Sequence, residues 1–213
     1  MTDNPQPPVE FVVRTVAQTA VANEKYFGDL DAVVGDGDFG YSLARGFELV
    51  LRDWDTFDRT DPATFLRKVA VVITSRIGGT SGPLWGTAFL RAATAAVGKS
   101  EVDGHTAVAM LRAATEGIQA RGNASLGDKT LLDALVPATD EIAHQIELGS
   151  DAPTTVRAAA TVARARADET AKLEARRGRA AYTGERSIGS VDPGAVAVAV
   201  IFEALADSWA AES

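Results

Sequence analysis

DPGAVAVAVIFEAL, residues 192–205, is the stretch on which the fold class depends. Alternating alanine and valine suit a buried strand as well as a buried helix, and periodicity alone does not separate the two. Asp192 followed by Pro193 marks a helix start, because an aspartate can cap the first turn and the fixed φ of proline suits that turn. The sequence offers no second strand candidate to pair with this one. The stretch therefore predicts a helix and an all-α protein.

Seven further helices are expected before this one. Apolar residues recur at spacings of three and four from Pro8 onward, the period of an amphipathic helix, and this first helix should end near Gly28. The others are expected, in chain order, at about 40–54, from Asp61-Pro62 to Gly78-Gly79, after Gly82-Pro83, from around Asp103, at about 129–148 and at about 153–175. Short connections favour antiparallel neighbours, so about eight helices predict an up-and-down bundle or barrel.

The composition is that of one globular unit. The chain has 213 residues, 46% of them hydrophobic and 23% charged, and contains no internal repeat or interior linker. These features predict a single domain over residues 1–213, with residues 1–7 flexible. Six aromatic residues occur at helical spacings, and most of them are interpreted as core: Phe47, Trp54, Phe65, Trp85, Phe89 and Phe202.

Charge and cysteine content exclude several classes of function. A net charge of −8 argues against a general nucleic-acid or anionic-membrane surface. The absence of cysteine excludes disulfides, thiolate zinc sites and thiol catalysis. No apolar run reaches the ~18 residues of a membrane helix, and the N-terminus lacks the features of a signal peptide, so we expect a cytoplasmic protein without a membrane partner.

An acidic, glycine-rich loop is the strongest candidate for a site. Residues 30–47 read LDAVVGDGDFGYSLARGF, in which Asp31, Asp36 and Asp38 fall within eight positions and glycines allow tight turns between them. Clustered carboxylates repel one another unless a hard cation lies between them, and oxygen ligands suit magnesium. The loop predicts a Mg²⁺ site with a phosphate ligand; the alternative is an acidic surface turn.

Three more loops precede helices. Residues 77–86, IGGTSGPLWG, offer free N–H groups and a helix dipole to an anion, although the alternative is a capped turn and this is no Walker A loop. Residues 121–130, RGNASLGDKT, taken alone suit a plain connection. Residues 176–195, RRGRAAYTGERSIGSVDPGA, form a loop too long for a mere connection, and its arginines suit bidentate phosphate contact. His105 and His144 are interpreted as surface or capping residues.

The order of these loops places them together. They follow the first, third, fifth and seventh expected helices, and alternate connections of an up-and-down bundle share one end. Metal carboxylates, phosphate-binding backbone and an arginine-bearing flap then converge. Phosphoryl transfer requires such charge neutralisation and positioning, with little covalent chemistry from the protein.

At these motifs the sequence resembles the DhaL subunits of dihydroxyacetone kinases, which also occur as the nucleotide-binding domain of single-chain dihydroxyacetone kinases. GDGD, GGTSGPLWGT, RGNASLGDKT and GRAAYTGERSIGSVDPGA appear in family order and spacing, and the resemblance covers nearly the whole chain. It implies a barrel of eight antiparallel helices with ADP or ATP bound at one end through Mg²⁺.

The resemblance also implies roles for individual residues. Asp31, Asp36 and Asp38 would hold two magnesium ions that bridge the nucleotide phosphates. Thr80 and Ser81 would contact phosphate. The remaining nucleotide positions that it implies are Gly122, Leu131, which stands where a methionine is often found, Arg179, and the closing run of Asp192, Pro193 and Gly194.

Two departures from the family pattern fall in a segment that touches the nucleotide phosphates in the family, Phe39, Gly40, Tyr41 and Ser42. Many members read GDGDHG, whereas Phe39 replaces that histidine, and Ser42 stands where an asparagine is common. In some family systems ADP stays bound and is rephosphorylated by a phosphotransferase-system protein, whereas in others ATP exchanges freely. The loss of the histidine favours ATP.

The first hypothesis is a kinase subunit that donates the γ-phosphate of ATP to a small keto-sugar of the dihydroxyacetone type. The resemblance implies that a separate DhaK-type partner holds this sugar covalently through a histidine. The alternatives are a tetrulose (erythrulose) kinase subunit, the nucleotide module of a fatty-acid kinase system, and a nucleotide-loaded co-regulator of a transcription factor. Self-association into a homodimer is left open.

Overall fold

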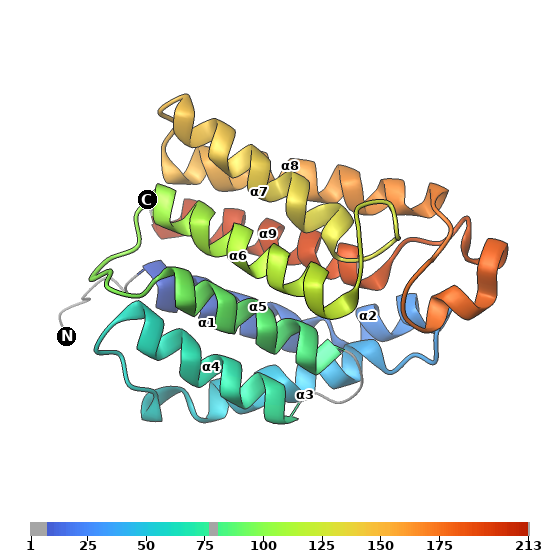
Figure 1. Cartoon of the computed structure of the whole chain (residues 1–213), viewed down its shortest axis with the longest axis horizontal. Coiled ribbons are helices and arrows are strands. Elements are labelled where there is room, and N and C mark those ends of the chain that lie inside the picture. Colours follow the sequence, from blue (N-terminus) through green and yellow to red (C-terminus); the bar gives the residue numbers. More distant parts are fainter. Residues whose placement is uncertain (1–7, 77–80, 213) are drawn as a thin grey trace.

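The computed structural model of the chain describes residues 8–76 and 81–212. Over these ranges the chain is helical and contains no strand, which confirms the all-α prediction. Figure 1 shows the long helices lying side by side along the longest axis, with the start of α1 and the end of α9 at the same end of the molecule. The elements are α1 (Pro8–Ala22), α2 (Glu24–Asp31), α3 (Phe39–Arg52), η1 (Trp54–Thr56), α4 (Pro62–Arg76), α5 (Ser81–Ala95), α6 (Gly104–Gly122), α7 (Leu132–Glu147), α8 (Ala152–Glu169), η2 (Thr170–Lys172), η3 (Arg179–Ser187) and α9 (Pro193–Glu212).

The helices form a closed barrel. From α3 to α9 each long helix packs against the next one in sequence, and α1 packs against both α3 and α9, which closes the ring. Helix α2 continues the course of α1 after a break and lies against α3 and α9. The up-and-down barrel of about eight helical passes is therefore confirmed.

Aspartate side chains begin four of the helices. The carboxylate of Asp61 accepts the N–H of Thr64 at 2.9 Å, that of Asp103 the N–H of Thr106 at 2.7 Å, and that of Asp151 the N–H of Thr154 at 2.8 Å. Each bond satisfies an N–H that the helix itself leaves free. Asp192 does the same for α9 through the N–H of Ala195 at 2.7 Å, which confirms the start expected at Asp192-Pro193. These caps explain why the starts of these four helices could be placed accurately.

Helix α9 is buried, as its unusual sequence requires. Val196 and Val198 are at most 3% exposed, and the alanines between them are fully buried. Because the valines and the alanines are both inaccessible, this part of the helix has apolar neighbours on all sides. Helix α9 packs against α1, α2, α7 and α8. Alternating alanine and valine thus reflect burial on every side rather than the two faces of a strand.

The first helix differs from the prediction. It was expected to end near Gly28, but α1 ends at Ala22 and α2 runs on through Gly28 to Asp31. The break lies at Asn23, whose φ and ψ of −105° and 17° leave the helical region and whose amide donates to the carbonyl of Thr19. A Cβ at Gly28 would lie 3.3 Å from the carbonyl oxygen of Gly37, so this glycine admits the following loop instead of ending the helix.

Other boundaries shift by a few residues. Helix α5 begins at Ser81, before Gly82-Pro83, and α7 begins at Leu132 instead of about 129. The helix expected at about 153–175 ends at Glu169 and is followed by η2. The Gly78-Gly79 stop, Thr80 and the flexible segment expected at residues 1–7 lie outside the described residues.

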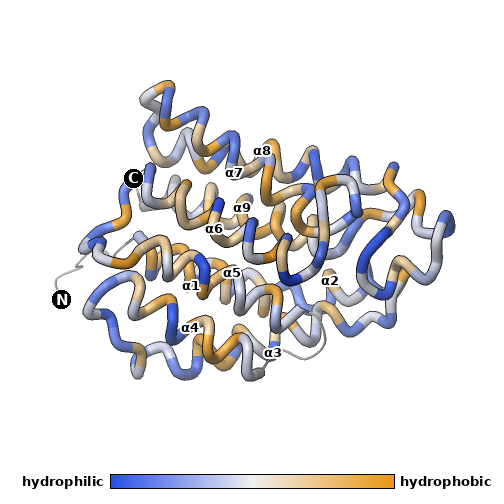
Figure 2. The backbone as a smooth tube through the Cα atoms, in the orientation of Figure 1, coloured by the Kyte–Doolittle hydropathy of each residue, from blue (hydrophilic) through white to orange (hydrophobic). Residues whose placement is uncertain are grey.

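Apolar side chains fill the barrel and also line a cavity within it. Phe47, Trp54, Phe65 and Phe202 are buried, which confirms their assignment to the core. Trp85 and Phe89 are partly buried and line an apolar cavity of about 670 Å³. Figure 2 shows apolar stretches along the helices and mostly hydrophilic connections at their ends. Among the described residues, no helix is long and apolar enough to cross a membrane.

Candidate functional site

Three carboxylates converge where α2 gives way to α3. Asp31 is the last residue of α2, Asp36 lies in the connecting loop, and Asp38 immediately precedes α3. One carboxylate oxygen of each lies within 4.8 Å of the others. Asp31 is half-buried, and the other two are exposed. Such an oxygen-only set suits Mg²⁺, and the convergence that the sequence predicted is present.

Glycines make this convergence possible. A Cβ at Gly35 would lie 2.3 Å from the Oδ1 of Asp31, and a Cβ at Gly40 would lie 2.0 Å from the carbonyl oxygen of Glu24. Gly37 has a φ of +76°, the left-handed region that glycine occupies without strain. A side chain at Gly35 or Gly40 would therefore push apart the acidic loop or the contact between α2 and α3.

Arg179 of η3 reaches this acidic cluster from a segment far away in sequence. Its guanidinium forms an ion pair with Asp36, and its Nη2 lies 3.4 Å from the Oδ2 of Asp38. The arginine side chain is 56% exposed, so a ligand can also reach it. The positive charge of Arg179 offsets part of the negative charge of the carboxylates, as a bound metal ion would.

The start of α3 contributes mainly backbone to the cluster. The N–H of Phe39 donates to the Oδ2 of Asp31 at 3.3 Å, and the N–H of Ser42 donates to the carbonyl of Asp38. The ring of Phe39 lies 6.1 Å from that of Phe27 and packs on the core. Tyr41 is exposed beneath the guanidinium of Arg45. Of this segment, the exposed Tyr41 ring is accessible to a ligand, while the Phe39 ring is partly buried against the core and Gly40 is buried.

A second group of predicted residues meets where α7 and α9 begin. A Cβ at Gly194 would lie 3.2 Å from the Cβ of Leu131 and 3.1 Å from the Oδ2 of Asp192. Pro193 opens α9 beside them. Gly122 ends α6, where an added Cβ would lie 3.4 Å from the Cδ2 of Leu84. Leu131, Asp192 and Gly194 are thus brought together around the start of α9.

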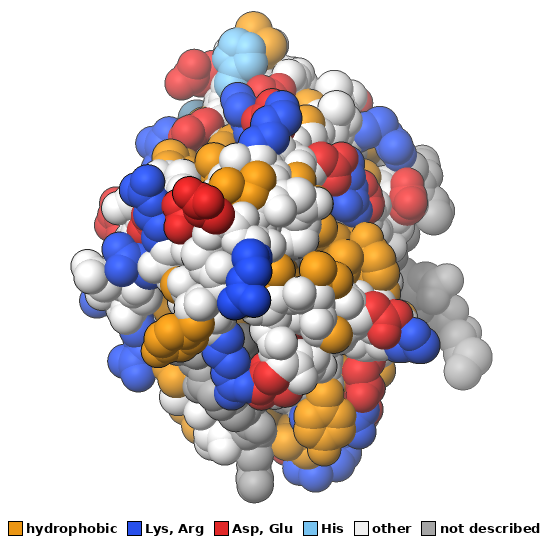
Figure 3. Space-filling view, turned by 90° about the vertical axis from the view of Figure 1, so that its right-hand side faces the viewer, with side chains coloured by type: hydrophobic (Ala, Val, Ile, Leu, Met, Phe, Trp, Pro, Cys, Tyr) orange, Lys and Arg blue, Asp and Glu red, His pale blue; other side chains and the backbone are white. Residues whose placement is uncertain are grey.

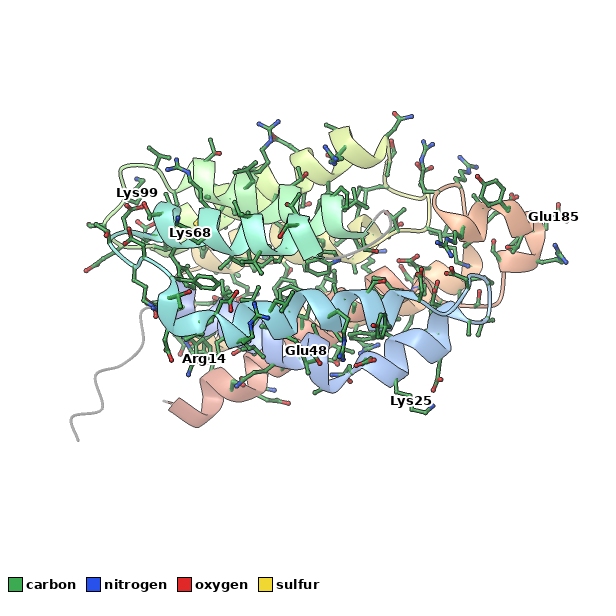
Figure 4. The ribbon with its side chains drawn as sticks, turned by 90° about the horizontal axis from the view of Figure 1, so that it is seen from below. Arg14, Lys25, Glu48, Lys68, Lys99 and Glu185 are labelled. Carbon is green, nitrogen blue, oxygen red and sulfur yellow. The ribbon has the colours of Figure 1, made fainter. Side chains whose placement is uncertain are left out.

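These groups share one end of the barrel (Figure 1), as the loop order predicted. The acidic loop, the start of α5, the α6–α7 connection and η3 all lie at the end opposite the start of α1 and the end of α9. Figure 3 faces this end and shows basic and apolar side chains interspersed across it, with acidic ones among them. In Figure 4, Glu185 of η3 marks this end, and Lys99 marks the opposite one.

Asp192 has an unusual protonation state. Its carboxyl is only partly accessible. Burial, together with the nearby negative charge of Asp133, raises its pKa to about 7. The N–H of Ala195 and the positive charge of Lys129 lower the pKa, but they do not cancel this rise. A group that changes charge near neutral pH therefore stands at the start of α9. Perturbed pKa values are commoner at functional sites than elsewhere.

Sequence reasoning missed three buried charged residues, Asp128 and Lys129 in the α6–α7 connection and Asp133 in the first turn of α7. The motif RGNASLGDKT was interpreted on its own as a plain connection. In the structure, the Asp133 carboxylate accepts the N–H groups of Gly127 and Thr130, which shapes the connection before α7. The available signal was the density of charged residues in a loop that precedes an apolar helix.

Known proteins are similar to this chain over most of its length. The DAK2 domain matches residues 33–207. The ADP-binding subunit DhaL of the PEP-dependent dihydroxyacetone kinase of Escherichia coli K12 is 36% identical over 182 residues, covering 85% of this chain and 87% of that protein. The L-erythrulose 1-kinase of Mycolicibacterium smegmatis is 38% identical over 200 residues, covering 92% of this chain and 34% of that protein.

Solved structures share the fold. The dihydroxyacetone kinase of C. freundii in complex with AMP-PNP and Mg²⁺ matches with a TM-score of 0.72 and 26% identity, covering 98% of this chain and 36% of that chain. Its native form matches with a TM-score of 0.74 and 29% identity, covering 94% of this chain and 34% of that chain. The chain therefore spans about a third of the length of these longer kinases.

Proposed function

This chain belongs to the DAK2 domain family, and from that premise we propose that it is the nucleotide-binding subunit of a kinase that phosphorylates a small keto-sugar. The observation that carries the proposal is the convergence of three carboxylates within 4.8 Å, with an arginine from η3 paired to two of them. Carboxylates and an arginine at one point suit a magnesium–polyphosphate ligand.

In this proposal Asp31, Asp36 and Asp38 hold Mg²⁺, as two ions. When bound, the metal neutralises the charge of the nucleotide phosphates and of the group in transfer. Arg179 would contact the phosphates, since a guanidinium binds phosphate oxygens as well as carboxylates. The start of α3 contributes the exposed Tyr41.

Three other elements complete the proposed nucleotide site. Ser81, the first residue of α5, adds hydroxyl and N–H donors for phosphate, where the helix dipole is positive. Thr80, the preceding residue in the sequence, is proposed to contact phosphate as well. The walls of the pocket are formed by Gly122, Leu131 and the run Asp192, Pro193 and Gly194.

The chain offers no residue that we assign as an acceptor of the phosphoryl group. Among the described residues, the acidic cluster has no histidine, and the sequence has no cysteine. We therefore infer that a DhaK-type partner holds the sugar and that this single domain supplies the donor. The E. coli relative is named an ADP-binding subunit of a PEP-dependent kinase. Both ATP and ADP rephosphorylated in place by a phosphotransferase-system protein are thus candidate donors.

Mixing the chain with Mg²⁺, a nucleotide and a DhaK-type subunit tests the proposal. ATP with dihydroxyacetone should give the sugar phosphate, and a parallel reaction with ADP, PEP and phosphotransferase proteins separates the two donors. The matched control is Asp36→Asn, which keeps the shape of the side chain and removes its charge. The absence of turnover with every donor and partner would overturn the proposal.

A tetrulose kinase is the second candidate. The specific observation in its favour is the M. smegmatis relative, an L-erythrulose 1-kinase that is 38% identical to this chain. Because the partner holds the sugar in this proposal, the choice between sugars resides in the partner. Erythrulose in place of dihydroxyacetone in the same assay distinguishes the two by their relative kcat/KM.

A further inference from the structure

Lys129 is a buried lysine to which the proposed nucleotide chemistry gives no role. It is 3% exposed and lies in the connection between α6 and α7. Its Nζ donates to three backbone carbonyls, those of Leu173 at 3.1 Å, Ser187 at 2.5 Å and Ser190 at 2.7 Å. All three acceptors belong to the segment that links α8 to α9, more than forty residues away in sequence. One ammonium group thus ties both ends of this segment to the barrel.

Asp128 completes the attachment from the neighbouring position. It is 6% exposed, and its carboxylate accepts from the Nε of Arg177 at 2.9 Å and from the N–H of Ser125 at 3.0 Å. Its carbonyl oxygen accepts the N–H of Arg176 at 3.0 Å. The pKa of Asp128 is lowered, first by the Ser125 N–H and then by Arg177, so the carboxylate is charged when it forms these contacts.

The backbone at this point is also unusual. Lys129 has a φ of 61°, a left-handed conformation that lysine rarely adopts. Such a conformation persists only where the surrounding contacts impose it, and it often marks a functional segment. Here it turns consecutive side chains, Asp128 and Lys129, toward the same distant segment. Burial lowers the pKa of Lys129, and the negative charge of Asp192 opposes this effect. The three carbonyl bonds satisfy the ammonium group inside the protein, where an unpaired charge would be costly.

The attached segment carries Arg179. Between the points that Asp128 and Lys129 hold, η3 projects over the end of the barrel and brings the guanidinium of Arg179 to the carboxylates of Asp36 and Asp38. Among the described residues, the other hydrogen bonds of this segment join residues 170–190 to one another. Examples are the N–H of Gly189 to the carbonyl of Ala171 at 2.8 Å and the N–H of Ala175 to the Oγ of Ser187 at 2.8 Å.

We propose that Asp128 and Lys129 are positioning residues that hold residues 173–190 in the one arrangement in which Arg179 reaches the acidic cluster. They act through Arg179 and do not touch the ligand themselves. The contribution of Arg179 to nucleotide binding rests on the proposed function above. The attachment of the segment does not, so the two ideas can fail separately.

Limited trypsin digestion of the nucleotide-free protein tests the attachment. The segment offers cleavage after Arg176, Arg177, Arg179 and Arg186. Lys129→Met removes the ammonium and keeps most of the apolar stem, and it should accelerate cleavage at these sites by about tenfold, read from fragment masses. Lys172→Met is the matched control, because this exposed lysine lies beside the segment and also removes one trypsin site. Equal cleavage rates in the two variants would overturn the proposal.

A milder variant keeps the test decisive if Lys129→Met does not fold. Arg177→Gln removes the guanidinium partner of Asp128 from a side chain that is 39% exposed, while the Asp128 carboxylate keeps the N–H of Ser125 as a donor. Faster cleavage after Arg179 and Arg186, without a change in the thermal midpoint, supports the proposal. Unchanged cleavage at both sites contradicts it.

A double-mutant cycle then tests whether the attachment acts through Arg179. The affinity for Mg²⁺-ADP is measured by calorimetry for Lys129→Met, Arg179→Ala and the double variant. If Lys129 works by positioning Arg179, the double variant binds no more weakly than Arg179→Ala alone. Additive losses would show that Lys129 only stabilises the fold and would overturn the positioning role. If the wild-type protein does not bind Mg²⁺-ADP, the proposed function fails, and the digestion result still decides whether the segment is attached as described.

Discussion

The acidic loop and the α6–α7 connection both gather charged side chains at the same end of the barrel, but they treat them in opposite ways. Asp36 and Asp38 are exposed and find their compensation in Arg179, a residue of a distant segment. Asp128 and Lys129 are buried, and neighbouring backbone and side-chain groups occupy their polar atoms. Exposed carboxylates that pair with an arginine of a distant segment remain accessible to a ligand. Buried charges with fixed partners shape the protein itself.

Removal of one exposed carboxylate should give the largest effect on binding and a small one on stability. Asp36→Ala takes a ligand from the metal site, and we expect the affinity for Mg²⁺-ADP to fall at least about 100-fold, because each carboxylate contributes both charge and an oxygen to the ion. The thermal midpoint should stay the same or rise, since repulsion within the cluster decreases. Calorimetry and a melting curve measure the two quantities.

The control for this variant is Asp29→Ala. It removes an exposed carboxylate that lies on α2, outside the acidic cluster, and pairs with Lys25. It should leave the affinity for Mg²⁺-ADP unchanged. Binding by Asp36→Ala that matches the control would show that the metal site lies elsewhere.

Removal of a buried carboxylate should have a large effect on stability and a small one on binding. Asp133 is 9% exposed and accepts the N–H groups of Gly127 and Thr130. Asp133→Ala leaves both donors without this partner, and we expect the free energy of unfolding to fall by about 2 kcal/mol. Urea denaturation measures this change. Asp140→Ala, on the exposed face of the same helix, is the control and should change the free energy by less than about 0.5 kcal/mol. Equal losses in the two variants would contradict the contrast between buried and exposed charges.

Asp192 is intermediate between the exposed and the buried charges. It is partly buried, and its pKa is raised to about 7, chiefly by burial. In the folded state it binds a proton more tightly than in the unfolded state, where an aspartate titrates near 3.9. Its contribution to stability is therefore fully present below about pH 4 and is lost as the pH rises toward 7. With an allowance for partial exposure, we expect a loss of about 1.5 kcal/mol across this window.

The matched variant is Asp192→Asn, which can still accept the N–H of Ala195 as a helix cap but does not titrate. Urea denaturation at several pH values between 4 and 8 compares it with the wild-type protein. The difference in the free energy of unfolding should grow in favour of Asp192→Asn as the pH rises. Parallel curves for the two proteins would show that Asp192 has an ordinary pKa in the folded state.

The same contrast explains how much the sequence could predict. The exposed cluster was visible because Asp31, Asp36 and Asp38 are close in sequence and have glycines between them. Helix starts were visible because a cap such as Asp103 lies beside the turn that it caps. Both features depend on local spacing.

The attachment of residues 173–190 was not visible, because it joins Lys129 to carbonyl groups 44 to 61 residues away. Backbone carbonyls leave no mark in the sequence, so nothing indicates that this lysine is buried. The break at Asn23 was missed for a related reason. The amphipathic pattern continues across it, and only the close approach of the loop at Gly37 explains why α2 runs past Gly28.

Phe39 offers the smallest and finest test of the contrast, because it lies beside the exposed cluster but points its ring into the core. The resemblance places a histidine here, and the sequence alone suggested that its loss alters the handling of the phosphoryl donor. In the structure the ring packs near Phe27 while its backbone N–H donates to Asp31. Phe39→His keeps that N–H and replaces an apolar ring with a polar one. We therefore expect a loss of about 1 kcal/mol in the free energy of unfolding, measured in urea, and less than about a threefold change in the affinity for Mg²⁺-ADP. Phe57→His, in a buried cluster near Trp54 and Phe65, is the control for a purely structural cost. A tenfold or larger change in nucleotide affinity for Phe39→His alone would return this position to the nucleotide site and give Phe39 a direct part in donor binding.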